Sequence, residues 1–267
     1  MTDLSGKTAL VTGSAQGIGH AVALSLASAG ARIAVHGLPG EPKADAAVAT
    51  LIAAGAPEAR FFGADMADPE AIGALMHDVA QWGGADILVN SAGIQFTAPL
   101  QEMPPEKWQA IIAINLSAAF YTMRVAMPEM ARRGYGRVIN IASVHGLVAS
   151  REKAPYVAAK FGLVGLTKVA ALEYANAGSR ASGGVTANCI APGWVETDLI
   201  APQIDARAAA HGGNREAGAA ALLAEKQPSQ RLSDPGEIGA LALWLAAPIA
   251  HNITGTTIPV DGGWTAQ

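Results

Sequence analysis

Short apolar runs rich in β-branched residues alternate with longer helical stretches along the whole chain. Most of these runs lack polar alternation, which is typical of strands covered by helices on both faces. The alternation predicts an α/β fold with a doubly wound, seven-stranded parallel sheet. The predicted strands are Thr8–Thr12, Arg32–Val35, Arg60–Gly63, Ile87–Asn90, Arg137–Ala142, Val185–Ile190 and Thr256–Val260.

The length of 267 residues is compatible with one large α/β domain. An apolar content of 51% and a charged content of 15% provide enough apolar surface for a sizeable core. We therefore expect a single domain over residues 1–267, with a substrate-covering excursion around residues 194–228. Within it, Ala201 to Asn214 looks irregular, as does Asn176 to Gly184.

Charge and cysteine content exclude several function classes. The net charge of −4 and the mixing of both signs give no basic face for nucleic acid or anionic lipid. The single cysteine, Cys189, lies in an apolar run and is expected to be a buried strand thiol. No apolar run approaches the ~18 residues that span a bilayer. We expect a soluble, cytoplasmic protein without a metal site.

A glycine-rich turn follows the first predicted strand and opens the first helix. Gly13, Gly17 and Gly19 allow a tight turn that brings backbone N–H groups and the helix N-terminus close to a pyrophosphate. We expect β-carbons at these positions to obstruct that approach. A purely structural turn is the alternative, but the strand–turn–helix context favours dinucleotide binding on a Rossmann-type fold.

Tyr156 and Lys160 are four residues apart, on one face of a predicted helix. The ordinary tyrosine pKa is about 10, and a cation at about 4 Å would contribute about 4 kcal/mol toward lowering it. Ser143 follows a strand at its carboxyl end, where open α/β sheets bind ligands, and can donate to a substrate oxygen. Together the three predict proton transfer by Tyr156, with an ordinary amphipathic helix as the alternative.

With this turn and these residues, the chain resembles the short-chain dehydrogenase/reductase family over essentially its whole length. The resemblance implies a homotetrameric nicotinamide-dependent oxidoreductase, in which Tyr156 exchanges a proton and Lys160 also holds the nicotinamide ribose. It implies a further catalytic residue, Asn115, whose backbone holds a water in the proton relay. Besides Tyr156 and Lys160, the implied cofactor contacts are Gly13, Ser14, Gln16, Gly17, Ile18, Gly19, Asp65, Met66, Asn90, Ala92, Gly93, Pro192, Gly193 and Val195.

The end of the second predicted strand determines which nicotinamide cofactor binds. An acid there would hold the ribose 2′-hydroxyl, and a base would accept a 2′-phosphate. The residues from His36 to Pro39 include neither an acid nor an arginine. NAD is expected, because nothing there would neutralise a phosphate. His36 itself is either a loop residue or a ribose contact.

Four polar residues are predicted to meet beside the hydride-transfer site: Gln95, His145, Lys153 and Gln203. Two amides, an imidazole and an ammonium would bind a small carboxylate through charge-assisted hydrogen bonds. A fatty or steroid substrate would require a mostly apolar pocket. Taken singly, each residue could instead lie on the surface or cap a loop.

Longer stretches resemble the bacterial branch of the family that oxidises D-3-hydroxybutyrate. They are Gly93–Gln95, Ser143–Ser150, Glu225–Ser229 and Asp261–Thr265. The expected reaction is the reversible, NAD-dependent oxidation of this small hydroxy acid to acetoacetate. The implied substrate contacts are Gln95, Ser143, His145, Lys153, Tyr156, Trp194 and Gln203.

Two alternatives remain open. One is a 3-oxoacyl or sugar/polyol reductase of the same family, with Arg132 and Arg133 as a docking patch for an acidic carrier protein. These arginines could equally interact with a helix C-terminus. The other alternative is a non-catalytic nucleotide-sensing protein, which would normally have lost Tyr156 or Lys160.

Overall fold

The computed structural model describes residues 2–266, and its centre is a seven-stranded, all-parallel sheet. The strand order β3-β2-β1-β4-β5-β6-β7 is that of a doubly wound sheet, which confirms the predicted fold class. The strands are β1 (Thr8–Val11), β2 (Arg32–Gly37), β3 (Ala59–Gly63), β4 (Ile87–Asn90), β5 (Tyr135–Ile141), β6 (Gly184–Pro192) and β7 (Thr257–Val260).

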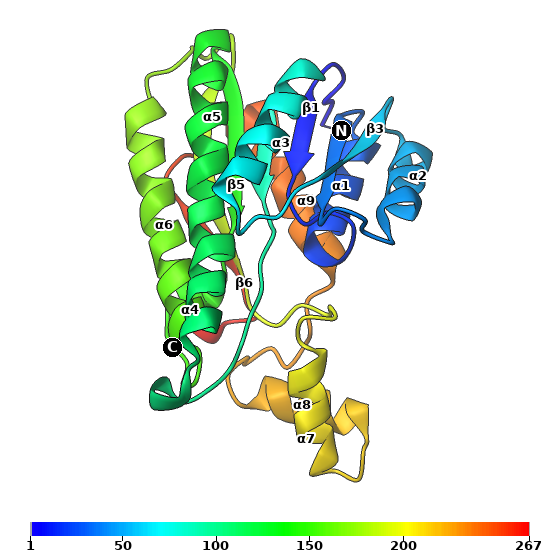
Figure 1. Ribbon diagram of the computed structural model, residues 1–267, viewed down its shortest axis with the longest axis vertical. Coiled ribbons are helices and arrows are strands. Elements are labelled where there is room, and N and C mark those ends of the chain that lie inside the picture. Colours follow the sequence, from blue (N-terminus) through cyan, green and yellow to red (C-terminus); the bar gives the residue numbers. More distant parts are fainter. Residues whose placement is uncertain (1, 267) are drawn as a thin grey trace.

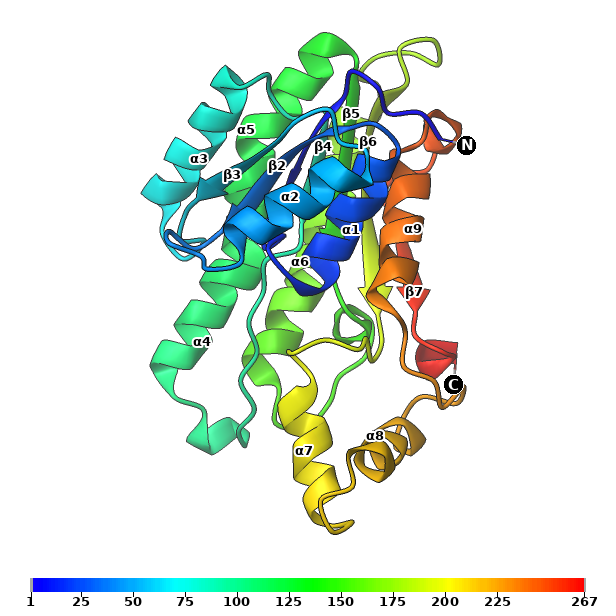
Figure 2. The ribbon, with the colours of Figure 1, turned by 90° about the vertical axis from the view of Figure 1, so that its right-hand side faces the viewer.

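Helices cover both faces of this sheet (Figures 1 and 2). One face carries α1 (Gly17–Ser28), α2 (Ala44–Ala54) and α9 (Pro235–Ala246), with an apolar cluster beneath them. The other face carries α3 (Pro69–Gln81), α5 (Ala118–Arg133) and α6 (Ala154–Tyr174) over a second cluster; α4 (Pro105–Ile112) packs against α6. The central strands are buried on both sides, which explains their uninterrupted apolar sequences.

Local signals define several helix ends. Asp68 caps α3 by accepting a 2.9 Å hydrogen bond from the backbone N–H of Glu70, and Pro69 occupies the first helical position. Gly55 ends α2 in the left-handed conformation, at φ 119°. Because the strands are parallel, the turns after β1, β4, β5 and β6 meet at one edge of the sheet.

The stretch Ala201 to Asn214 is more regular than its sequence suggested. It contains α7 (Ala201–Ala209), and α8 (Arg215–Ala224) follows it, capped by the Asn214 side chain. The abundant alanines favour helix, whereas the glycines beside His211 suggested a loop. Both helices extend beyond the carboxyl edge of the sheet (Figure 1). Residues 176–183 form the expected exposed loop.

Two helical segments are longer and more apolar than the sequence analysis had expected. Pro105–Arg133 and Ala154–Tyr174 both reach the length and mean hydropathy of a membrane span. Within them, 44% and 50% of the most apolar windows are buried inside the chain. The buried part packs in the protein core, and the remaining apolar side chains are exposed on the outer sides of these helices.

Candidate active site

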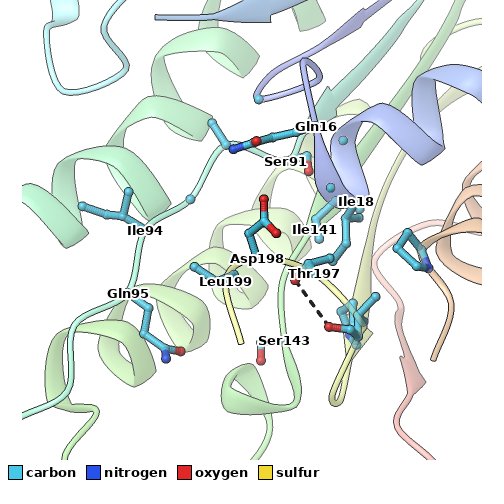
Figure 3. A pocket seen from close by; sticks show the side chains of 18 of the residues that line it. Gln16, Ile18, Ser91, Ile94, Gln95, Ile141, Ser143, Thr197, Asp198 and Leu199 are labelled. Carbon is cyan, nitrogen blue, oxygen red and sulfur yellow. Dashed lines mark hydrogen bonds between the residues drawn. The ribbon is translucent and has the colours of Figure 1, made fainter. Parts of the chain in front are cut away.

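A pocket of about 870 Å³ opens at the carboxyl edge of the sheet. Its walls come from the turns after β1, β4, β5 and β6, and Gln16 and Ser143 lie at opposite ends of the close view (Figure 3). The volume is within the range of cofactor and ligand sites. The predicted site residues that line it are Gly13, Gln16, Gly17, Ile18, Gly19, Asp65, Met66, Ala92, Gly93, Gln95, Ser143, His145, Lys153, Tyr156, Lys160, Pro192, Gly193, Trp194 and Val195.

The three glycines of the first turn have different roles. A β-carbon on Gly13 would lie 2.9 Å from the Ala92 backbone, and one on Gly19 would lie 2.3 Å from the Gly13 carbonyl. These two positions need glycine because of the turn's own packing, not because of a ligand. Only Gly17, at φ 59°, faces open space, with Thr197 the nearest neighbour at 3.9 Å. Its missing side chain leaves a cradle at the start of α1 that suits a phosphate group.

His36 holds the glycine-rich turn in place through a hydrogen bond to its backbone, a role different from the loop residue or ribose contact that the sequence suggested. The strand continues to Gly37, so the imidazole is buried, at 2% exposure. Its Nδ1 accepts from the Gly13 N–H at 3.0 Å, and Nε2 lies 3.2 Å from the Ala64 carbonyl. Burial lowers the pKa of His36 to about 4, so the ring is neutral at pH 7.

Ser14, predicted as a cofactor contact, does not line the pocket. Its side chain is fully buried, and its Oγ accepts a 3.0 Å hydrogen bond from the His36 N–H. Asn90 is likewise absent from the pocket wall: its amide bonds to Asn140 at 2.8 Å and accepts from Thr122 at 2.7 Å. Both side chains point into the protein. Ser14 bonds to β2, and Asn90 bonds to β5 and α5.

An acidic residue outside the predicted site, Glu41, also lines the pocket. Glu41 lies close to Gly37, where an added β-carbon would come 3.1 Å from the Glu41 Cγ. It follows β2 by four residues, so it lies outside the segment where an acid was sought. Lys43, nearby, bonds to Gln16 and lies 3.8 Å from Asp198.

The predicted proton-transfer residues meet at the inner end of the pocket. Burial raises the pKa of Tyr156, and only its hydrogen bond with Ser143 lowers it. The Lys160 ammonium lies 5.6 Å from the centre of the Tyr156 ring and donates to the Ile141 carbonyl at 2.7 Å. Burial lowers the pKa of Lys160 to about 8. The lowering of the Tyr156 pKa that the cation alone predicted is therefore outweighed by desolvation of the phenol.

Asn115 lies in a π-helical turn, Ala113–Ser117, between α4 and α5. Its side chain accepts from the Ile94 N–H and donates to the Ile94 carbonyl, both at 2.9 Å, so it holds the segment after β4 in place. Behind the pocket, a cavity of about 10 Å³ borders both Asn115 and Lys160. That is about the size one water requires.

Lys153 and Gln95 lie together in the wall beside Tyr156. The Lys153 ammonium is 3.4 Å from the Gln95 Oε1 and 4.9 Å from the centre of the Trp194 ring. Lys153 is 7% exposed, and no ion pair with a carboxylate forms within residues 2–266. Burial, together with nearby Lys226 and Arg207, lowers its pKa to about 8.

His145 is also in this wall, but both of its ring nitrogens already have partners. Nδ1 lies 3.3 Å from the Ser143 Oγ, and Nε2 lies 2.8 Å from the Ser150 Oγ. Burial and the charges of Lys153 and Lys226 lower the pKa of His145 to about 3. The ring is therefore neutral, not a cation.

Gln203, the fourth predicted carboxylate ligand, lies on α7 and does not line the pocket. Its Oε1 is buried and has no hydrogen-bond partner among residues 2–266. Trp264, which was not predicted, does line the pocket, 5.5 Å from both Trp194 and His145 between ring centres. Cys189 is a buried strand thiol, as expected, whose pKa burial raises.

Comparison with known proteins places this site in a family. The model of the short chain dehydrogenase family matches residues 7–208. The chain belongs to the short-chain dehydrogenase family. It is an oxidoreductase. Of the site residues that the sequence predicted, Ser14, Asn90, Asn115 and Gln203 do not line the large pocket.

Among relatives of this short-chain dehydrogenase, the D-beta-hydroxybutyrate dehydrogenase of Cupriavidus necator is 50% identical over 266 residues, covering 99% of this chain and 100% of the relative. The Rhizobium meliloti enzyme of the same name is 44% identical, covering 98% and 99%. A solved Beutenbergia cavernae protein, provisionally named an NAD(P)-dependent gluconate 5-dehydrogenase and containing NADP at low occupancy, is 32% identical. It has a TM-score of 0.85 and covers 99% of each chain.

Proposed function

We propose that this enzyme catalyses the reversible, NAD-dependent oxidation of D-3-hydroxybutyrate to acetoacetate. The observation that carries the proposal is the buried Lys153, which lies without a carboxylate partner in the described chain and beside Gln95, in the wall next to Tyr156. A buried cation is unfavourable by itself, and a substrate carboxylate would compensate it. The two relatives named for this substrate support the same reading.

In this proposal, Tyr156 exchanges the proton of the substrate oxygen. Because burial raises its pKa, the phenol is protonated at neutral pH and ready to donate a proton to acetoacetate. Oxidation requires the reverse transfer, and the Lys160 charge would stabilise the developing phenolate. Ser143 donates a hydrogen bond to the same substrate oxygen. A bound nicotinamide supplies the acceptor for the hydride that leaves the carbinol carbon.

Asn115 and Lys160 would complete a proton path behind Tyr156. The small cavity that they border has room for one water between the buried ammonium and the π-helical turn. A proton leaving Tyr156 could pass along this path without crossing the substrate. Lys160, with three donors, would also hold the ribose hydroxyls of the cofactor.

The open cradle at Gly17 and the N-terminus of α1 would hold the cofactor pyrophosphate, and Asp65 and Met66 line the adenine end. We propose NAD as the cofactor. Glu41 in the wall would repel a 2′-phosphate and can accept from a ribose hydroxyl. Lys43, two residues after Glu41, bonds to Gln16 and lies 3.8 Å from Asp198.

The carrier-protein alternative is disfavoured by the position of its supposed docking patch. Arg133 donates to the Ala85 carbonyl at 2.9 Å, and Ala85 precedes β4 at the amino edge of the sheet. Arg132 pairs with Glu129 on its own helix, and both arginines occupy the last turn of α5. A carrier bound there would be at the opposite edge of the sheet from the pocket.

We further propose a cytoplasmic homotetramer. Apolar side chains on the outer sides of α5 and α6 are exposed in the single chain, which suits helices that pack against another copy. The residues concerned are Phe120, Val125, Phe161, Val169 and Leu172. Light scattering of the purified protein tests the assembly, and a monomer would contradict it.

The direct test of the function is a substrate comparison with NAD. D-3-hydroxybutyrate, its L enantiomer, gluconate and a 3-hydroxyacyl carrier thioester are each supplied, and NADH formation is followed by absorbance. The proposal predicts the highest kcat/KM for D-3-hydroxybutyrate. A higher value for the thioester or for gluconate would favour the reductase alternatives.

A further inference from the structure

A chain of hydrogen bonds leads from Ser143 away from the substrate to a lysine in a distant part of the sequence. Lys226, just after α8, donates from its Nζ to the Ser150 Oγ at 2.7 Å. The Ser150 Oγ lies 2.8 Å from the His145 Nε2, and the His145 Nδ1 lies 3.3 Å from the Ser143 Oγ. The Lys226 ammonium also lies 5.5 Å from the centre of the Trp264 ring, which helps to hold it there.

The direction of this chain determines where the Ser143 hydrogen points. A neutral imidazole has one N–H donor and one acceptor, so His145 either donates to Ser143 or accepts from it. If His145 accepts at Nδ1, the Ser143 hydrogen is directed toward the imidazole. If His145 donates from Nδ1, that hydrogen remains available for the substrate oxygen and Tyr156.

Lys226 favours the second arrangement. An ammonium can only donate, so the Ser150 oxygen must accept from it. The positive charge then favours a Ser150 hydroxyl whose hydrogen points away, toward the lone pair of the His145 Nε2. The proton of the ring must therefore be on Nδ1. The His145 backbone N–H also donates to the Ser143 Oγ, at 3.2 Å, so this oxygen accepts twice from the same residue.

We propose that Lys226 and Ser150 are positioning residues that keep His145 in its Nδ1–H tautomer and thereby aim the Ser143 hydroxyl at the substrate oxygen. The inference deepens the proposed function, on which it rests for the identity of the reaction.

Neutron crystallography of the deuterium-exchanged protein tests the tautomer without any substrate. We expect deuterium on the Nδ1 of His145 and on the Ser143 hydroxyl, directed into the pocket. Deuterium on Nε2 would overturn the proposal. Because this measurement needs no turnover, it decides the tautomer even if the enzyme fails to oxidise D-3-hydroxybutyrate, in which case the proposed function alone would be wrong.

Kinetics then test the consequence. In Lys226→Met and Ser150→Ala, kcat should fall about tenfold, because a donor to a developing oxyanion contributes about 10²–10³ and its reorientation would be incomplete. KM should change less than about threefold, and the double variant should be no slower than the single ones, because both changes break one chain. Lys226→Arg and Ser150→Thr keep the donor and the hydroxyl, so they should restore kcat.

Arg215→Met is the matched control, since it removes a positive charge of α8 that pairs with Asp205 and makes no contact with the hydrogen-bond chain. Its kcat should stay within about twofold of the original enzyme. An equal loss of kcat in this control would show a general effect of charge and would overturn the proposal. A raised KM with unchanged kcat in Lys226→Met would also overturn it, because Lys226 would then be binding the substrate carboxylate directly.

Discussion

Replacing Lys153 with methionine should have opposite effects on stability and on catalysis. The drop in the pKa of Lys153 from 10.5 to about 8 corresponds to about 3 kcal/mol by which the buried charge destabilises the fold at neutral pH. The sign follows from linkage: the folded state binds this proton less tightly than the unfolded chain, so stability rises only as the pH goes above about 8. Methionine keeps the volume beside Trp194 and removes the charge.

The same change should weaken substrate recognition. A hydrogen bond to a charged group contributes about 1.5–3 kcal/mol, so kcat/KM for D-3-hydroxybutyrate should fall about 10- to 150-fold. Urea unfolding at fixed protein concentration should give a midpoint that rises in Lys153→Met, by up to the equivalent of about 3 kcal/mol. Lys168→Met, at an exposed lysine of α6, the helix that begins just after Lys153, should change neither quantity.

A Lys153→Met enzyme that unfolds more easily and retains kcat/KM within about threefold would refute the reasoning. Such a result would mean that Lys153 stabilises the pocket wall as a structural element. Loss of both stability and activity in Lys153→Met would also contradict the reasoning, because the buried charge of Lys153 would then not destabilise the free enzyme.

Further predictions concern the cofactor end and the buried histidines. The urea midpoint should be constant near pH 7 and should fall as the pH is lowered from about 6.5 to 5. In this range the histidines of the unfolded chain bind protons, whereas the folded chain keeps His36 and His145 neutral, because burial lowers their pKa values to about 4 and about 3. A midpoint that does not change with pH would contradict the burial of these two residues. Gly17→Ala should weaken NAD binding, measured by calorimetry, and Gly19→Ala should lower the melting temperature more than Gly17→Ala does. A larger loss of melting temperature in Gly17→Ala than in Gly19→Ala would contradict the turn geometry. Glu41→Gln should reduce the ratio of kcat/KM with NAD to that with NADP, and an unchanged ratio would exclude Glu41 from cofactor choice.

The sheet could be predicted almost strand by strand because each central strand is buried on both faces. A strand such as β1 or β4 then has only apolar residues, and the glycines and caps around it mark its ends. The helices of the excursion were harder to recognise. In α7, alanines that favour helix are followed by His211 and two glycines, and tertiary packing rather than local pattern defines the element.

The site could be predicted only where its residues follow strands or share a helix. Ser143, Tyr156 and Lys160 satisfy this condition. His36 does not, because the sequence alone does not indicate that β2 continues to Gly37 and turns the imidazole beneath the glycine turn. Lys226 is 76 residues from Ser150, so only the folded chain brings them together. The direction of the Tyr156 pKa shift likewise depends on burial, which spacing does not reveal.

The measurement that tests the central claim most directly is the initial rate of NADH formation from D-3-hydroxybutyrate, compared with its uncharged methyl ester, in the original enzyme and in Tyr156→Phe. We expect kcat/KM for the acid to exceed that for the ester by about 10-fold or more. We also expect Tyr156→Phe to lose turnover while still binding NAD. Equal rates for acid and ester, or turnover that survives in Tyr156→Phe, would contradict the account.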